Sequence, residues 1–302
     1  MKMKFLIGLA MCLTASAAYP QNHDGASSTG PVLSYDVIQT SETSMHANMT
    51  LVSGERDAVL IDVPFSRADA FRVVARILDS GKTLRAILIT HDHPDHFFGL
   101  DVLADEFPDA DILAASIVVA DMTRSVPIKF DRWSDDLGTN APHRPVVPTV
   151  LDGQSYLLEG HRLTVIGPMQ GDHVRSTVVW DAETRTLVAG DAIYNGMFVW
   201  LGEHTPDRYA DWLTALDRLE AMGPLRIVAG HTRPGLTDDN TGIEWTRTYI
   251  SYMAEAAQQA HSAVELQDMV RTRFPEATDV YGCFLLCTSA QVAMGEIEPW
   301  DE

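Results

Sequence analysis

A dense group of histidines and aspartates follows directly on an apolar segment, and this feature constrains the fold most strongly. Residues 84–90 are apolar and β-leaning apart from Arg85, which indicates a core strand. The sequence then reads HDHPDH over residues 91–96. The chain must therefore form a buried strand whose carboxyl end presents several polar side chains.

The spacing within this group is typical of a metal site. His91 and His93 are separated by one residue and project to the same side at the strand end, which suits two imidazoles on one ion. Asp95 and His96 follow at the turn into a helix and are candidates for a second ion beside the first. A solvated polar turn is the alternative interpretation, but this pattern of residues at a strand end favours metal binding.

Strand and helix patterns alternate along the rest of the chain. A capping box over 66–69 predicts a helix that Gly81 ends. The segments 84–91 (LRAILITH) and 225–231 (LRIVAGH) both indicate a strand with a histidine at its tip, which suits two similar halves facing one site. Further strands are expected at 32–40, 47–53, 56–63, 110–115, 155–158, 161–167, 176–181 and 185–190, and helices within 238–273.

The pattern His91-x-His93-x-Asp95-His96 resembles the signature of the metallo-β-lactamase-fold hydrolases. The likeness extends through LVAGD at 187–191 to VAGH at 228–231 and covers most of the chain. The resemblance implies an α/β fold of the αββα sandwich type, formed by residues 19–302.

The same resemblance assigns two further ligands and a mechanism. In that family an aspartate at the end of a later strand bridges two metals, and a histidine after a final strand completes the second site; Asp191 and His231 match these positions. The implied cofactor is a pair of divalent ions, with zinc favoured by the mixture of imidazoles and carboxylates. Their shared hydroxide would attack the substrate carbonyl, and Asp95 would bind the second ion and orient that hydroxide.

The third protein ligand of the first ion could be either of two neighbouring residues, Asp172 or His173. The family supplies a third histidine about four residues before a Ser or His that opens the next strand. Counting back from Ser176 gives Asp172, whereas the nearby histidine is His173. Either Asp172 replaces the imidazole or the loop is shifted by one residue; the resemblance favours Asp172. The histidines interpreted as non-ligands are His143, His161, His204 and His261.

Tyr194 is a candidate catalytic residue because it follows Asp191 by three positions. Resemblance to the acyl-homoserine-lactone lactonases of the family implies that its phenol holds the substrate carbonyl; the alternative is a core tyrosine. Six further residues are expected in loops near the metal face and favour an apolar pocket: Met45, His46, Trp133, Met197, Phe198 and Trp200.

The expected function is hydrolysis of a carbonyl ester, lactone or amide of a small molecule. A β-lactamase is the alternative enzyme, weakened because the zinc-dependent β-lactamases generally lack an aspartate at the bridging position. A non-catalytic metal-binding protein is the alternative from another class.

Residues 1–18 have the pattern of a secretory signal peptide: Lys2 and Lys4, an apolar run over 5–13, then small residues. The apolar run is too short to span a bilayer. We therefore expect a secreted or periplasmic protein with no stable membrane association after cleavage. The 22 Lys and Arg against 42 Asp and Glu give a formal net charge of −20, which disfavours nucleic acid as a partner. No oligomeric state is predicted.

Two other segments carry structural expectations. Cys283 and Cys287 could form a disulfide in an exported protein, but the spacing also suits neighbouring turns of a helix, and buried packing is the favoured interpretation. A helix is expected near 116–125. Residues 127–153, with several prolines, are expected to form a long loop and a candidate lid.

Overall fold

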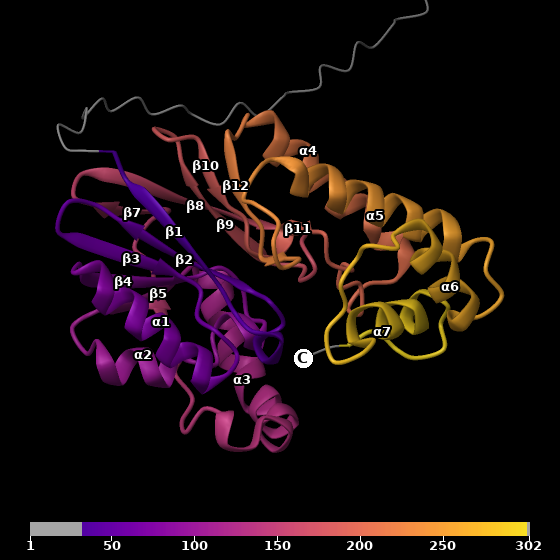
Figure 1. The fold of residues 1–302 in the computed structure, drawn as a ribbon, viewed down its shortest axis with the longest axis horizontal. Coiled ribbons are helices and arrows are strands. Elements are labelled where there is room, and N and C mark those ends of the chain that lie inside the picture. Colours follow the sequence, from indigo (N-terminus) through magenta and orange to yellow (C-terminus); the bar gives the residue numbers. More distant parts are fainter. Residues whose placement is uncertain (1–31, 301–302) are drawn as a thin grey trace, which may run out of the picture.

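Two β-sheets face each other and helices cover their outer faces, so the expected αββα sandwich is confirmed (Figure 1). This computed structural model describes residues 32–300. The expected signal peptide at 1–18 therefore lies outside the described residues. Within them, no helix is long and apolar enough to cross a membrane.

The first sheet is built from the N-terminal half of the chain and has the strand order β1-β2-β3-β4-β5-β6. Its strands are β1 (Ser34–Gln39), β2 (Asn48–Ser53), β3 (Asp57–Ile61), β4 (Thr83–Ile89), β5 (Asp111–Ala114) and β6 (Thr149–Val150). The helices of this half are α1 (Arg67–Ser80), α2 (Leu100–Glu106) and α3 (Ser116–Leu137). The strands β3 to β6 are parallel, so β4 carries its carboxyl end to the same edge as β3 and β5.

The second sheet has the order β12-β10-β9-β8-β7, and a separate two-stranded ladder pairs β11 with β13. The strands are β7 (Ser155–Leu158), β8 (His161–Met169), β9 (Ser176–Asp181), β10 (Thr186–Val188), β11 (Tyr194–Asn195), β12 (Arg226–Val228) and β13 (His231–Thr232). The helices of this half are α4 (Tyr209–Ala221), α5 (Thr241–Ala257), α6 (Ala263–Arg273) and α7 (Phe284–Ala293).

Alternating side chains along the central strands build the layers. In β4, Ala86 and Leu88 belong to the apolar cluster between the two sheets, whereas Ile87 and Ile89 pack in the cluster under the helices. Because successive side chains of a strand point to opposite faces, a strand buried on both sides needs this continuous apolar run. The run ends where polar residues begin, and this places the 91–96 segment at the edge between the sheets.

The capping box at the start of α1 is confirmed in part by its hydrogen bond. The Ser66 hydroxyl accepts from the Asp69 backbone N–H at 3.2 Å, which satisfies one of the free donors of the first helical turn. Gly81 follows α1 with a φ of 66°, a left-handed conformation that glycine adopts without the penalty of a Cβ.

The expectation of a long loop over 127–153 is wrong for residues 127–137. Helix α3 continues to Leu137 with Pro127 inside it. A proline in a helix loses one backbone hydrogen bond and crowds the preceding turn, but the buried side chains on both sides of it, Val126 and Lys129, favour continuation. Tertiary packing therefore outweighs the local preference of proline, and Trp133 lies on a helix rather than in a lid.

The favoured interpretation of Cys283 and Cys287 as packing residues is also wrong, because the two form a disulfide. Cys283 precedes α7 with a non-helical φ of −159°. Its Cα lies 5.3 Å from that of Cys287, within the normal range for a bridged pair. The bridge encloses the first turn of α7.

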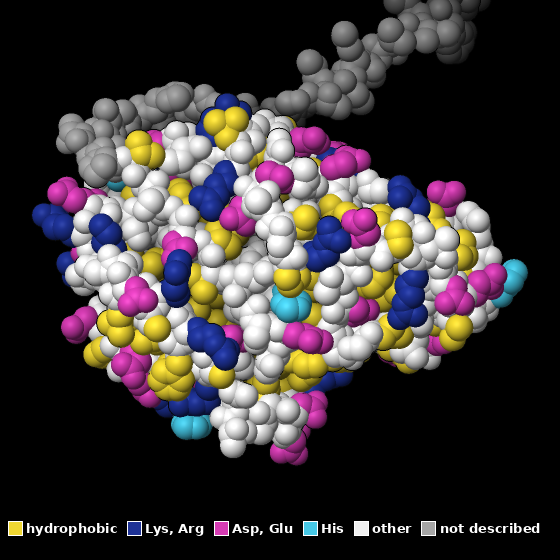
Figure 2. Space-filling view, in the orientation of Figure 1, with side chains coloured by type: hydrophobic (Ala, Val, Ile, Leu, Met, Phe, Trp, Pro, Cys, Tyr) yellow, Lys and Arg dark blue, Asp and Glu magenta, His cyan; other side chains and the backbone are white. Residues whose placement is uncertain are grey.

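Acidic and basic side chains are mixed on the face of the molecule that Figure 2 shows. Figure 2 shows acidic side chains spread over the visible face of both halves, with basic side chains between them. Arg76 and Asp36 form one such exposed pair, with Nη2 2.7 Å from Oδ2.

Candidate metal centre

Seven buried histidines and aspartates form two clusters that share one residue. The first cluster consists of His91, His93, Asp172 and Asp191, and the second of Asp95, His96, Asp191 and His231. Within each cluster, one nitrogen or oxygen of every residue lies within 4.8 Å of the others. Asp191 belongs to both clusters, which is the arrangement expected of a residue that bridges two ions.

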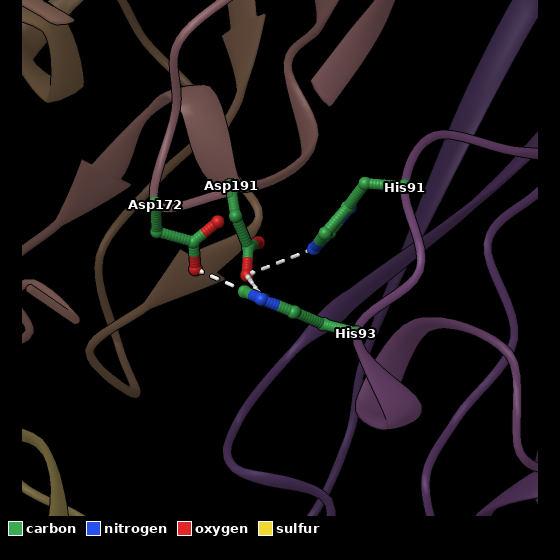
Figure 3. A group of neighbouring side chains, drawn as sticks. All are labelled: His91, His93, Asp172 and Asp191. Carbon is green, nitrogen blue, oxygen red and sulfur yellow. Dashed lines mark ion pairs between the residues drawn. The ribbon is translucent and has the colours of Figure 1, made fainter. Parts of the chain in front are cut away.

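The ends of strands from both sheets supply these side chains. His91 and His93 follow β4, and the short 3₁₀ turn Pro94–His96 carries the next two residues of the motif. Asp172 lies between β8 and β9, and Asp191 follows β10. In Figure 3 the two histidines extend from one side and the two aspartates from the other, with their polar atoms converging. The site therefore exists only where the two sheets meet.

Hydrogen bonds outside the clusters orient His91 and His93. The Thr90 hydroxyl lies 2.9 Å from His91 Nδ1, which leaves Nε2 directed at Asp191 Oδ2, 3.5 Å away. His93 is turned the other way: Nε2 lies 2.7 Å from Glu203 Oε1, and Nδ1 lies 3.3 Å from Asp172 Oδ2. Each imidazole is thus held through one nitrogen and offers the other to the cluster, as ligating histidines usually do.

His96 and His231 are held in the same manner. His96 Nδ1 lies 3.0 Å from Asp62 Oδ2, and His231 Nδ1 lies 2.8 Å from the Met45 carbonyl oxygen. The opposite nitrogens converge on Asp191: His96 Nε2 is 3.0 Å from Oδ1, and His231 Nε2 is 3.2 Å from Oδ2. All four outer partners are oxygen atoms, so a neutral imidazole would donate outward and direct a lone pair inward.

Several converging atoms have no hydrogen bond in the buried site. They are His91 Nε2, Asp172 Oδ1 and Asp191 Oδ1; the contact of His96 with Asp191 Oδ1 is close, but its angles do not suit a hydrogen bond. A buried polar atom without a partner costs free energy, and such an atom in a native protein requires an explanation. A cation between these atoms provides it, so the residues fit a divalent metal.

The pKa values show how strongly the site favours positive charge. Burial and the charge of Asp191 raise the pKa of Asp172 to about 6. His231 is fully buried, which lowers its pKa, but the carboxylates of Asp191 and Asp95 raise it to about 10. Carboxylates packed this closely therefore need protons or cations among them.

The structure places Asp172 and His173, the two candidates for the third ligand of the first ion, in different surroundings. Asp172 lies in the first cluster beside His93, whereas His173 Nε2 lies 3.2 Å from Asp92 Oδ1, outside both clusters. This position agrees with the interpretation of Asp172 as a replacement for an imidazole, and ligation itself stays a prediction.

The Tyr194 hydroxyl lies at the metal centre rather than against an unrelated core partner. It donates to Asp172 Oδ2 at 2.7 Å, lies 3.3 Å from Asp191 Oδ2, and the ring stacks on His231 with centroids 5.0 Å apart. The phenol is thus positioned to orient ligand carboxylates, and its catalytic role stays a prediction.

A pocket opens over the clusters, and three of the six residues expected near it line it. Met45, Trp133 and Trp200 do, whereas His46, Met197 and Phe198 do not. Met197 and Phe198 belong instead to the apolar core. The lining residues that the sequence analysis missed are Pro94, Glu203, Phe284, Leu285 and Trp300.

Two residues that contact histidines of the clusters, Asp62 and Glu203, were also missed, and they differ in how clearly the sequence indicates them. Asp62 directly follows strand β3 and has a φ of 61°, so a polar residue at that strand end was a detectable candidate. Glu203 lies in an irregular segment before α4 with no motif around it. Only the folded chain brings Glu203 to His93.

Lys129 is buried behind the motif and fixes its backbone. Its ammonium lies 3.2 Å from Asp92 Oδ2 and also donates to the Asp92 carbonyl oxygen. Although burial raises the pKa of Asp92, the charge of Lys129 holds that pKa well below its usual range. The Ser125 hydroxyl donates to the same carboxylate at 2.9 Å.

We expect Lys129→Met to lower the free energy of unfolding by about 3–5 kcal/mol, because it leaves the buried Asp92 carboxylate without its cation. Urea unfolding in the presence of a chelator measures the change without a contribution from metal. The exposed Lys82→Met, which removes a surface ammonium, should change it by less than about 0.5 kcal/mol. Equal effects of the two substitutions would contradict the structural role of Lys129.

Residues 43–231 match the family model of the metallo-beta-lactamase superfamily, and this segment contains both clusters. The match spans more than half of the chain. The chain therefore belongs to the metallo-beta-lactamase superfamily, and its buried histidine and aspartate clusters are groups that could hold metal ions.

Two curated relatives share part of the sequence. The Beta-lactamase-like protein 2 homolog of Caenorhabditis elegans is 29% identical over 147 residues, which are 48% of this chain and 41% of that protein. The Uncharacterized protein YobT of Bacillus subtilis (strain 168) is 30% identical over 149 residues, 48% of this chain and 61% of that protein. The chain thus spans less than two thirds of either relative.

Solved structures share the fold over more of the chain. A metallo-beta-lactamase family protein from Thermus thermophilus has a TM-score of 0.61 at 22% identity, covering 86% of this chain and 92% of that one. A metallo-beta-lactamase from Pontibacter korlensis has a TM-score of 0.55 at 16% identity, with 72% and 99% covered. At such identities the likeness shows the fold alone.

Proposed function

We propose that this protein is a dinuclear metallohydrolase, with zinc as its metal, that cleaves a carbonyl ester, lactone or amide of a small molecule. The observation that carries the proposal is the pair of clusters joined by Asp191, with one nitrogen of each histidine held from outside and the other directed inward. A single structural ion would not need seven converging donors.

The donor set divides between the two ions. His91, His93 and Asp172 would hold the first, and Asp95, His96 and His231 the second, with Asp191 between them. Two such ions supply a water of lowered pKa as nucleophile and polarise the substrate carbonyl. Imidazole with carboxylate is a donor mixture that suits zinc.

The chain's own residues would position the reacting groups. Asp95 lines the pocket next to His231, with Oδ2 3.2 Å from Nε2, and can accept a proton or hydrogen bond from the attacking water. Tyr194 lines the same pocket, and its O–H would exchange the hydrogen bond to Asp172 for one to the oxyanion developing on the substrate. The aromatic residues around them limit the access of bulk water.

The test is a panel of lactones, aryl esters and β-lactams, assayed with zinc-loaded and chelator-treated protein. We expect zinc-dependent hydrolysis of at least one lactone or ester and about two metal ions per chain by elemental analysis. Zinc content near zero after loading would overturn the metal site. Two bound ions with no hydrolysis of any carbonyl compound would support the non-catalytic alternative, and preferential hydrolysis of β-lactams would support the β-lactamase.

We also propose export of the chain, on the basis of residues 1–18. The disulfide between Cys283 and Cys287 supports it, because such bonds persist mainly in oxidising compartments.

A further inference from the structure

The pocket over the two clusters contains no lysine or arginine side chain among its described lining residues. Apart from the phenol of Tyr194, its ionisable residues are His93, Asp95, Asp172, Asp191, Glu203 and His231. Four of these are acids, and Glu203 is not needed as a ligand because it lies outside both clusters. The pocket thus carries one carboxylate more than the metal centre uses.

The carboxylates outweigh the positive charge of a metal centre that carries its hydroxide. Two divalent ions would bring four positive charges, which three ligand carboxylates, on Asp95, Asp172 and Asp191, and one hydroxide would offset. Glu203 adds a further negative charge, with Oε1 2.7 Å from His93 Nε2 and a side chain only 13% exposed. A pocket with this excess of negative charge repels anions.

Two cationic side chains that contact the motif or the aromatic residues of the pocket are engaged elsewhere. Lys129 is buried against Asp92 and does not line the pocket. The Arg132 guanidinium stacks on the Trp300 ring, 3.5 Å from its centroid, and lines a neighbouring cavity. Neither is placed to receive a carboxylate of a substrate in the pocket.

Aromatic side chains form one wall of the pocket. Trp200 and Phe284 are stacked with centroids 4.9 Å apart, and Trp300 packs edge-on against Trp200 at 5.1 Å. Trp133 contacts Phe284 at 5.8 Å. We call these four residues the aromatic wall; such surfaces bind flat or apolar groups.

Two features hold the wall in place. The Trp300 backbone N–H donates to the Gly202 carbonyl oxygen at 2.9 Å, which fixes the C-terminal segment beside the site. Phe284 lies inside the loop that the disulfide closes.

We propose that the substrate is an ester, lactone or amide without negative charge, which packs a flat apolar group against the aromatic wall, and that Glu203 makes the pocket reject anionic substrates. This inference rests on the proposed hydrolase function and specifies its substrate class. It excludes β-lactams that carry a carboxylate beside the scissile ring.

Three 4-nitrophenyl esters of similar length test the charge preference: the pentanoate, the negatively charged hemiglutarate, and the positively charged 4-(trimethylammonio)butanoate. We expect kcat/KM for the neutral and cationic esters to lie within about tenfold of each other and the anionic ester to be at least about tenfold poorer. Anionic hydrolysis as efficient as neutral hydrolysis would overturn the proposal.

The variant Glu203→Gln tests whether the preference against anionic esters depends on the charge of this residue. The amide oxygen can still accept from His93, so the imidazole keeps its orientation while the charge is lost. The ratio of kcat/KM for the anionic ester to that for the neutral ester should rise severalfold. The corresponding ratio for the cationic ester should fall. An unchanged ratio would remove Glu203 from the proposal.

A binding assay separates failure of this inference from failure of the proposed function. Benzyl alcohol, benzyltrimethylammonium and benzylsulfonate are titrated into zinc-loaded protein, with tryptophan fluorescence as the signal, since three tryptophans line the pocket. We expect the sulfonate to bind at least about tenfold more weakly than the other two. Trp300→Leu should weaken all three probes alike, because it alters the wall and not the charge.

If the protein hydrolyses none of the esters but binds the three probes in the expected order, the hydrolase function is overturned and the charge preference is kept. Tightest binding of the sulfonate would overturn the charge preference whatever the hydrolysis assay gives.

Discussion

Asp191→Ala should deplete both metal positions at once. The aspartate is the single residue shared by the two clusters, with Oδ1 3.0 Å from His96 Nε2 and Oδ2 3.5 Å from His91 Nε2. Loss of even an outer partner of a ligand costs about 10–100-fold in metal affinity or activity. We therefore expect metal content to fall from about two ions per chain to below about one and kcat/KM to fall by more than about 100-fold.

Elemental analysis after zinc loading and dialysis, followed by assays on the best substrate, measures both effects. Asp105→Ala is the matched control, because it removes an exposed aspartate that pairs with Arg144 and belongs to neither cluster. Retention of two ions by Asp191→Ala, with activity close to that of the unmodified protein, would show that Asp191 does not bridge a metal pair.

The second large effect is expected for Asp172 and not for its neighbour. Asp172→Ala removes an oxygen that lies 3.3 Å from His93 Nδ1 and should lower metal occupancy and hydrolysis together, by about 10–100-fold. His173→Ala should leave the metal content near normal, because that imidazole contacts Asp92 outside both clusters. Metal loss in His173→Ala combined with normal binding in Asp172→Ala would reverse this assignment.

A second variant at position 172 tests the effect of a carboxylate in place of an imidazole. A carboxylate adds negative charge to the first ion, which makes that ion a weaker Lewis acid than a site with three histidines. Asp172→His should therefore raise turnover if the imidazole fits. It would also remove one negative charge from the pocket, so hydrolysis of an anionic ester should improve relative to a neutral one.

Much of the fold follows from local patterns in the sequence. The apolar run at 84–90 requires a strand with two buried faces, and the structure has β4 there with side chains in both apolar clusters. The box at Ser66 and Gly81 marked both ends of α1 because a cap and a left-handed terminator act through neighbouring residues alone. Such signals need no knowledge of the tertiary structure.

The errors have the opposite origin. Pro127 is a helix breaker by local criteria, yet α3 passes through it because its neighbours are buried against the rest of the protein. Cys283 and Cys287 have helical spacing, but the chain leaves the helix at Cys283 and the pair is bridged. In both cases the outcome depends on contacts that the local sequence does not contain.

The sequence by itself determined the motif at 91–96, its position at a strand end and the two distant partners, because one fixed spacing of residue types allows few geometries. Only the tertiary structure decided that Asp172 rather than His173 lies in the first cluster, since both occupy one turn and a rotation of the backbone exchanges them. It alone brought Glu203 to His93, 110 positions away in the chain. The physical reason is that the clusters form between two sheets, so each donor is placed by the packing of both layers and not by its own neighbours.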